Sequence, residues 1–216
     1  MIILLAMKKY AWGCLGLAVL LPLLALIGGC NSYNRLVGLS QQTDKQWAQV
    51  QNVYQRRADL IPNLVQTVSG AANFEKSTLT EITQARASVG QVKINPNQSP
   101  ASAAELESFQ KAQDQLSSAL SRLLVVVERY PDLKATANFR DLQAQLEGTE
   151  NRITVERQRF NEALLAYNTA IKRFPTLLFA GMLGFSPKPY FTSTPGAETP
   201  PKVQFNFGTP PPPVKP

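Results

Sequence analysis

Arg56-Arg57-Ala58-Asp59-Leu60-Ile61-Pro62-Asn63-Leu64-Val65 decides how the first half of the chain folds. Apolar residues recur at helical spacing before and after this decamer: Trp47, Val50, Tyr54, Ile61, Leu64 and Val68. A single apolar seam therefore runs through it. Pro62 is expected to bend or end a helix, because its ring removes one backbone hydrogen bond at a cost of roughly 3 kcal/mol.

Arg57 falls on this seam, three residues after Tyr54 and four before Ile61. A guanidinium at such a position needs a partner. Arg56 and Asp59 are interpreted as solvated charges beside the proline. For Arg57, a solvated position and a buried pair remain equally open.

The composition of the 216-residue chain limits the classes of function. An apolar share of 44% supports one domain with appendages. The net charge of +7 is dispersed along the chain, so no nucleic-acid partner is expected. The sequence has no histidine, which removes the commonest general base and the usual zinc ligand. We expect no enzyme activity, no cofactor, and no catalytic or metal-binding residue.

Residues 1–30 form the first predicted unit, a signal peptide or membrane anchor. Lys8 and Lys9 precede Tyr10–Ile27, an uncharged apolar stretch typical of an export signal. Ile27-Gly28-Gly29-Cys30 resembles a bacterial lipobox, so Cys30 is expected to be lipidated. An uncleaved signal anchor, a single N-terminal transmembrane helix, is the less favoured alternative. Either interpretation places the remaining chain outside the cytoplasm.

Residues 31–185 are predicted to form an all-α domain, an antiparallel, up-and-down four-helix bundle with long, coiled-coil-like helices. The first two helices are expected at roughly 33–70 and 74–92, unless the segment 69–73 continues one helix. Turn residues predict a loop at 93–100, and Ser102 with Glu105 fits a capping box for the third helix.

The third helix is expected to end at Tyr130-Pro131, because the residue before a proline avoids the helical region. Asn138 is predicted to cap the last helix, which would end at Phe174-Pro175. Its core column repeats every seven residues and is typical of a bundle. The column consists of Phe139, Leu146, Ile153, Phe160, Tyr167 and Phe174.

The C-terminal part of the chain changes composition. Leu177–Phe185 is a short apolar run that is expected to pack against the bundle end, with the membrane surface as the alternative. Residues 186–216 hold many of the 16 prolines and are predicted to be an extended or disordered tail. Within that tail, Lys202–Phe207 alternates as a strand would and is a candidate to pair with a partner.

Several ordered motifs lie between Tyr33 and Phe207: Tyr33–Val37, Trp47, Arg56–Val65, Phe74–Lys76, Glu81–Arg86, Tyr130–Ala135, Asn138-Phe139, Glu147–Ile153, Arg159–Asn161, Tyr167-Asn168, Phe174-Pro175 and Gly184-Phe185. Together these motifs are similar to those of the LemA family. The resemblance implies a membrane-attached bundle of four antiparallel helices with no established enzyme activity. Two positions depart from the family pattern: Phe160, where a tyrosine is common, and Phe74, where a histidine is frequent.

Two candidate sites follow from the expected helix pairing. The first and last helices have nearly equal lengths and run antiparallel, so counting along both predicts that Arg56 or Arg57 bonds to Glu150 or Asn151. With Asp59, Pro62 and Asn63, these residues form a polar cluster that either fixes register or lines a pocket. The second candidate is the bundle-end loop with Tyr130, Pro131, Asp132 and Lys134, because loops commonly carry binding residues.

The sequence therefore favours a membrane-anchored, non-enzymatic interaction or scaffold protein of the bacterial cell envelope. Its expected partners are the membrane and an unidentified protein. The alternative is a binding module for a peptide or small molecule, which a pocket of several hundred Å³ beside Arg57 would favour.

Overall fold

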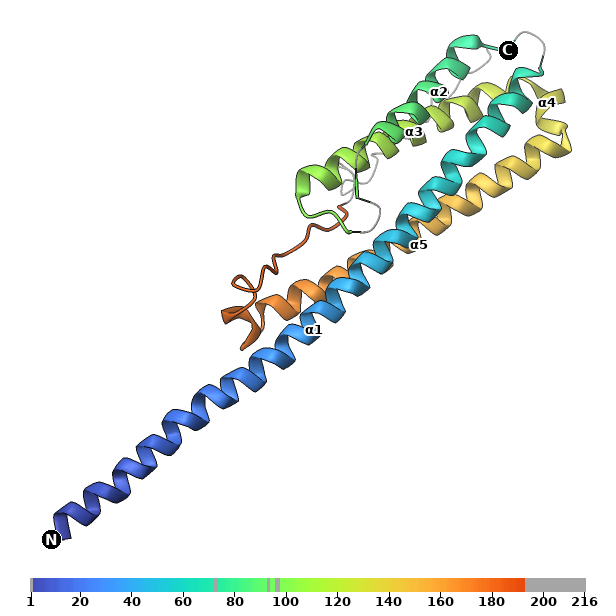
Figure 1. Ribbon diagram of the computed structural model, residues 1–216. Coiled ribbons are helices and arrows are strands. Elements are labelled where there is room, and N and C mark those ends of the chain that lie inside the picture. The colour runs from blue at the N-terminus through green and yellow to red at the C-terminus, as the bar shows by residue number, and fades with distance from the viewer. Residues whose placement is uncertain (1, 72–73, 93, 96–97, 193–216) are drawn as a thin grey trace, which may run out of the picture.

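Helices are the dominant regular structure in the part of the chain that the computed structural model describes, which is residues 2–71, 74–92, 94–95 and 98–192. For residues 2–19 and 21–27 this description covers the backbone alone. No strand occurs in these residues, so the all-α prediction is confirmed. The helices are α1 (Ile2–Ser69), α2 (Lys76–Gln91), α3 (Ala103–Val127), α4 (Pro131–Ala135) and α5 (Ala137–Lys172), followed by the 3-10 turn η1 (Thr176–Leu178), as Figure 1 shows.

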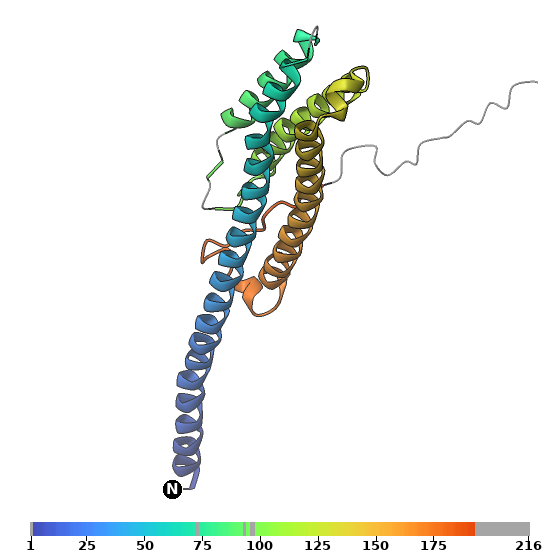
Figure 2. The ribbon, with the colours of Figure 1, turned by 90° about the vertical axis from the view of Figure 1, so that its right-hand side faces the viewer.

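The long helices pack in two antiparallel pairs. α5 runs back along α1, and α2 runs back along α3 (Figure 1). The N-terminal part of α1 projects beyond all the other helices, and both views show this (Figures 1 and 2). Among the described residues, no helix combines the length and apolar character needed to cross a membrane. The side chains of the predicted apolar stretch, Leu20 excepted, lie outside those residues.

The helical body has two regions with separate cores. We call the region farther from the N-terminus of α1 the distal part. Here all four long helices and α4 contribute to one apolar cluster. Its buried residues include Ile61, Leu64 and Val68 of α1, Ile82 of α2, Leu116, Leu123 and Val127 of α3, Leu133 of α4, and Phe139 and Leu146 of α5.

The proximal part, nearer the N-terminus of α1, has a core of mainly aromatic side chains. The rings of Trp47, Phe109 and Phe160 meet there, with ring centroids 5.2 Å apart for Trp47–Phe109 and 5.4 Å apart for Trp47–Phe160. A smaller cluster around Leu36 and Tyr167 lies still closer to the N-terminus of α1. Since α2 contributes no residue to these clusters, other segments complete them.

One of those segments is the stretch of residues 186–192, which we call the strap. It has no regular secondary structure, and it lies on α5 through several hydrogen bonds. Phe191 of the strap is buried in the aromatic core. The strap is the first part of the predicted extended or disordered tail, and in the structure it packs against the helices. The rest of that tail, including Lys202–Phe207, lies outside the described residues.

Helix α1 does not end at Pro62, contrary to one of the two expected outcomes. A proline at position 62 leaves the carbonyl of Ala58, four residues earlier, without its helical donor. The Nε of Arg86 on α2 donates to this carbonyl oxygen at 3.0 Å. A side chain from the neighbouring helix thus replaces the missing backbone donor and allows α1 to continue to Ser69.

The other helix boundaries agree with the sequence in part. α1 ends at Ser69, so the predicted break before the second helix is confirmed. Ser102 accepts from the backbone N–H of Glu105, while the Glu105 carboxylate accepts from Ala101, one residue before the expected position.

Two predictions about the last helix are wrong. Thr136, not Asn138, caps α5, because its hydroxyl accepts from the N–H of Phe139. Phe174 is not a core residue, since α5 ends at Lys172 and the ring is 80% exposed. The third helix also stops at Val127, and Tyr130-Pro131 instead begins the short helix α4.

Candidate functional site

Arg57 lies fully buried at the boundary between the distal and proximal cores. Its guanidinium contacts two other helices. It forms an ion pair with Glu150 of α5, with 3.0 Å between Nη1 and Oε2. It also donates to Ser117 Oγ at 2.8 Å and to the side-chain oxygen of Gln113 at 2.5 Å, both on α3. The predicted bond between the arginine pair and Glu150 or Asn151 is thus present as Arg57–Glu150.

The environment of Arg57 is polar on one side and aromatic on the other. The guanidinium carbon lies 5.1 Å from the centroid of the Tyr54 ring. Burial raises the pKa of the Tyr54 phenol, while the charges of Arg157 and Arg57 act in the opposite direction. The Nε of Arg57 is buried without a hydrogen-bond partner among the described residues. The hydrogen bonds of its Nη1 and Nη2 atoms go to acceptors of the same chain.

The Glu150 side chain is 52% exposed, whereas that of Arg57 is 2% exposed. Water therefore screens the carboxylate, and the pair is weaker than a fully buried one. The neutral oxygens of Gln113 and Ser117 accept further hydrogen bonds from the buried guanidinium. This arrangement connects α1 to α3 and α5 at one level of the bundle.

The remaining residues of the first predicted cluster do not join Arg57. Arg56, Pro62, Asn63 and Asn151 are exposed. Asp59 is also exposed and accepts from Gln55 on its own helix at 2.7 Å. The interpretation of Arg56 and Asp59 as solvated charges agrees with these positions.

A pocket of about 200 Å³ adjoins Arg57, and Glu147 and Glu150 contribute to its wall. The expected sign of a binding module was a pocket of several hundred Å³ at this place. The observed pocket is smaller, so the geometry favours a structural role for Arg57.

The predicted bundle-end loop lies beside a larger open pocket of about 880 Å³ at the distal end. Tyr130, Pro131 and Asp132 line it, together with residues near the end of α1. The Tyr130 ring packs on Phe74, with centroids 5.0 Å apart. Lys134 does not line the pocket and pairs with Glu128 at 2.6 Å.

Sequence reasoning missed a second polar cluster, around Lys188 of the strap. The Nζ of Lys188 donates to Ser99 Oγ at 2.7 Å and lies 3.2 Å from Asp44 Oδ1. It also donates to Thr43 Oγ1 at 3.2 Å and lies 5.2 Å from the centroid of the Tyr167 ring. Lys188 thus connects the strap to α1, to α5 and to the loop before α3.

Two asparagines of α5 hold the backbone of the strap. Asn168 accepts from the N–H of Lys188 and donates to its carbonyl, both at 2.9 Å. Asn161, two helical turns earlier, does the same with Phe191, both at 3.0 Å. The spacing of seven residues places both amides on one face of α5, directly after the core residues Phe160 and Tyr167.

The described part of the chain contains no group of three or more His, Cys, Asp or Glu side chains placed to hold a metal ion. Cys30 is exposed at its position in α1 and forms no disulfide there.

Comparison with known proteins identifies the family of the chain. The family model of the LemA family matches residues 46–205. The chain belongs to the LemA family. The matched range contains Arg57, Glu150, both asparagines and the strap. It therefore covers the Arg57 cluster of this LemA-family chain and part of the Lys188 cluster, whose Thr43 and Asp44 precede it.

Curated relatives of this LemA-family chain include magnetosome proteins and a protein named LemA. Magnetosome protein MamQ 2 of Paramagnetospirillum magneticum is 26% identical over 187 residues, covering 78% of this chain and 67% of the relative. Magnetosome protein MamQ of Magnetospirillum gryphiswaldense is 34% identical over 82 residues, covering 38% and 30%. Protein LemA of Metamycoplasma hominis is 27% identical over 127 residues, covering 59% and 53%.

Proposed function

We propose that this LemA-family chain is a membrane-attached, non-enzymatic scaffold on the extracytoplasmic side of a bacterial membrane, with its long helices forming an up-and-down four-helix bundle. The observation that carries this proposal is an exposed apolar patch at the place where α1 leaves the helical body. Bundle surfaces of this kind present contacts to partners without needing reactive groups.

The apolar end patch lies at and just after the end of α5. Its side chains are unusually exposed for their type: Phe174 80%, Leu177 57%, Leu178 59%, Met182 86% and Leu183 42%. A contiguous exposed apolar surface on a soluble body typically marks a contact with a membrane or a protein. Lys172 and Arg173 directly precede the patch and are exposed, which favours an anionic surface.

The position of the patch along α1 corresponds to the outer edge of the headgroup layer of a bilayer. The Tyr33 ring of α1 packs edge-to-face on Phe185, with centroids 5.8 Å apart, and this contact fixes where the patch meets α1. At 1.5 Å per residue, Tyr33 lies about 9 Å along the helix from Ile27, the end of the predicted apolar stretch. The polar headgroup layer on each side of a bilayer is roughly 5–8 Å thick. If the hydrocarbon core ends near Ile27, Tyr33 lies just beyond this layer, and the patch would contact the outer surface of the headgroups.

The interior of the protein supports a scaffold more than an enzyme. The buried cation Arg57 and the half-buried Lys188 direct their donors at acceptors within the chain. An active site instead keeps reactive groups directed at a substrate position.

Mass spectrometry of the N-terminus tests the attachment. Protein recovered from its native membrane is expected to begin with a lipid-modified Cys30. An intact Lys8-Lys9 segment would identify the uncleaved anchor instead. A water-soluble, unmodified chain in the cytoplasm would refute membrane attachment.

Nitroxide labels test the patch separately. In nanodiscs, with Cys14→Ser and with Cys30 either lipidated or replaced by serine, a label introduced through Met182→Cys is expected to collide mainly with lipid-soluble oxygen. A label introduced through Val125→Cys, on the distal part and 70% exposed, is expected to collide mainly with a water-soluble nickel complex. Equal behaviour of the two labels would refute contact between the patch and the membrane.

A binding module is the second candidate function, and the distal pocket of about 880 Å³ favours it. If the pocket holds a ligand, Tyr130→Ser should abolish ligand-induced thermal stabilisation, and Asp141→Asn on the exposed side of α5 should not. Equal effects of the two variants would exclude this pocket.

A further inference from the structure

The strap contains a short sequence that occurs twice in the C-terminal region. Pro187-Lys188-Pro189-Tyr190-Phe191 and Pro201-Lys202-Val203-Gln204-Phe205 share the pattern Pro-Lys-x-x-Phe. The first copy lies in the described strap, and the second lies outside the described residues. The contacts of the first copy therefore show which parts of the pattern the helical body recognises.

The phenylalanine of the first copy fills an aromatic cage. The Phe191 ring stacks on Trp47, with centroids 6.1 Å apart, and meets the Phe160 ring edge-on at 5.6 Å. The guanidinium carbon of Arg157 lies 4.6 Å from the centroid of the same ring. Phe191 is only 6% exposed, so this side chain is a main anchor of the strap.

The lysine of the first copy is the second anchor. The Lys188 amine binds Asp44 and the hydroxyls of Thr43 and Ser99. The Asp44 side chain is only 15% exposed, so a strap without a cation here would leave a largely buried carboxylate without its counter-charge.

The backbone of the first copy is held at the same two positions. Asn168 and Asn161 bond both the N–H and the carbonyl of Lys188 and of Phe191, respectively. These bonds do not depend on which side chains occupy the strap. Recognition of an extended backbone combined with side-chain pockets is a general mode of peptide binding.

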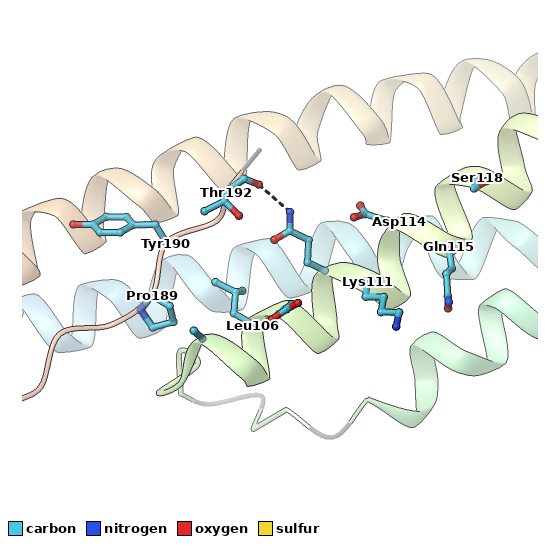
Figure 3. A pocket seen from close by; sticks show the side chains of 11 residues that line it. Leu106, Lys111, Asp114, Gln115, Ser118, Pro189, Tyr190 and Thr192 are labelled. Carbon is cyan, nitrogen blue, oxygen red and sulfur yellow. Dashed lines mark hydrogen bonds between the residues drawn. The ribbon is translucent and has the colours of Figure 1, made fainter. Parts of the chain in front are cut away.

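The two variable positions of the pattern, Pro189 and Tyr190, lie at an open groove. Pro189 and Tyr190 line an open groove of about 580 Å³ against α3, which Figure 3 shows together with the bond from Gln110 to the carbonyl of Thr192. Tyr190 is 38% exposed. Replacing these two residues by the Val203-Gln204 pair of the second copy would therefore remove no anchor.

We propose that the surface gripping the strap is a binding site for extended Pro-Lys-x-x-Phe peptides, and that residues 201–205 of the same chain are its second occupant, in place of 187–191. Lys202 then takes the position of Lys188, and Phe205 enters the aromatic cage. The residues between Phe185 and Pro201 form a longer connection, whose closure entropy grows only slowly with length. This inference does not depend on membrane attachment.

A peptide-binding experiment tests the proposal with the full chain in detergent micelles. The probe is a fluorescent peptide covering residues 199–208. It is added to the native chain, to Phe191→Ala, and to Phe191→Ala combined with Phe205→Ala. The affinity is expected to rise in that order, and the doubly substituted chain should bind at least about tenfold more tightly than the native chain, because both internal competitors have lost their aromatic anchor.

Variant peptides test which residues are recognised. Lys202→Ala and Phe205→Ala in the probe should each weaken binding at least about tenfold, and the matched control Phe207→Ala should leave it unchanged. Equal binding to the three chains, or equal binding of the three variant peptides, would overturn the proposal.

Photo-crosslinking covers the case in which the substituted chains fail to fold. A benzophenone amino acid replaces Phe205 in an otherwise native chain, and a second chain carries it in place of Phe207. Crosslinks from position 205 are expected at Trp47 and Phe160 and should be at least about tenfold fewer from position 207. The absence of crosslinks from position 205 to the aromatic cage would refute the second occupant.

Discussion

The distal and proximal parts of the protein each bury an apolar core, but different segments cover the two cores. In the distal part, four long helices and α4 bury one another's apolar faces. In the proximal part, α2 is missing, and the strap covers the core with one aromatic side chain, one lysine and four backbone hydrogen bonds. The comparison teaches that repetitive helix packing can be completed by a single irregular segment if specific polar side chains hold its backbone.

Arg57 lies between the distal and the proximal core. The buried residues of α1 change from Tyr54 in the proximal core to Leu60 in the distal core on either side of it. On α5, Ile153 and Leu146 flank Glu150 in the same way. A polar layer thus lies between the two cores and connects three helices.

The largest expected effect is in the distal core. Leu64 is completely buried there, so Leu64→Ala should lower the free energy of unfolding by about 2–5 kcal/mol. Leu165→Ala, at a position that is 60% exposed, should change it by less than about 0.5 kcal/mol. Denaturant unfolding followed by circular dichroism measures both, and equal losses would contradict the assignment of the distal core.

The polar layer should show a smaller effect. Glu150→Gln leaves the Arg57 cation with neutral acceptors and should lower the free energy of unfolding by about 1–3 kcal/mol. Glu147 is exposed one helical turn away, and Glu147→Gln is the matched control, with an expected change below about 0.5 kcal/mol. A stabilising effect of Glu150→Gln would show that the ion pair is not needed to fix register.

The proximal part should respond locally. Asn168→Ala removes the two hydrogen bonds to Lys188, which should lower the free energy of opening of the strap by about 1–3 kcal/mol. Hydrogen exchange measures this as faster exchange of the Lys188 amide, with unchanged protection in the distal core. Asn151→Ala, at an exposed position, is the control. Loss of protection throughout the protein would contradict a separable strap.

The smallest effect concerns the proline in α1. Arg86→Met removes the donor to the Ala58 carbonyl and should cost about 1 kcal/mol. In a Pro62→Ala background the cost should fall, because residue 62 then supplies its own N–H to that carbonyl. A double-mutant cycle measures this coupling, with Arg140→Met as the exposed control. Independent effects of the two substitutions would refute the replacement of the backbone donor.

The sequence predicted the regular helix packing better than the irregular strap. Regular spacing predicted the helices, the core columns and, by counting along paired helices, the Arg57–Glu150 bond. Sequence reasoning left open whether Pro62 bends or ends a helix. The continuation of α1 depends on Arg86, a residue of another helix that no local pattern identifies. Phe174 continued the column in sequence but not in space, since the helix stops two residues before it.

The strap was missed because its anchors are not periodic. Lys188 stands in a proline-rich segment that composition alone marks as unstructured. A signal did exist: Asn161 and Asn168 repeat at the heptad interval beside buried aromatic residues, where amides are costly unless they are bonded.

The burial of Trp47 among phenylalanine rings provides an optical reporter. The chain has two tryptophans, and the other, Trp12, falls in the apolar stretch near the N-terminus. With Trp12 replaced by phenylalanine, the emission would come from Trp47 alone. The Phe191 ring stacks on Trp47, so its departure would change the indole emission. An unlabelled sample can therefore show in real time whether Phe191 is in place.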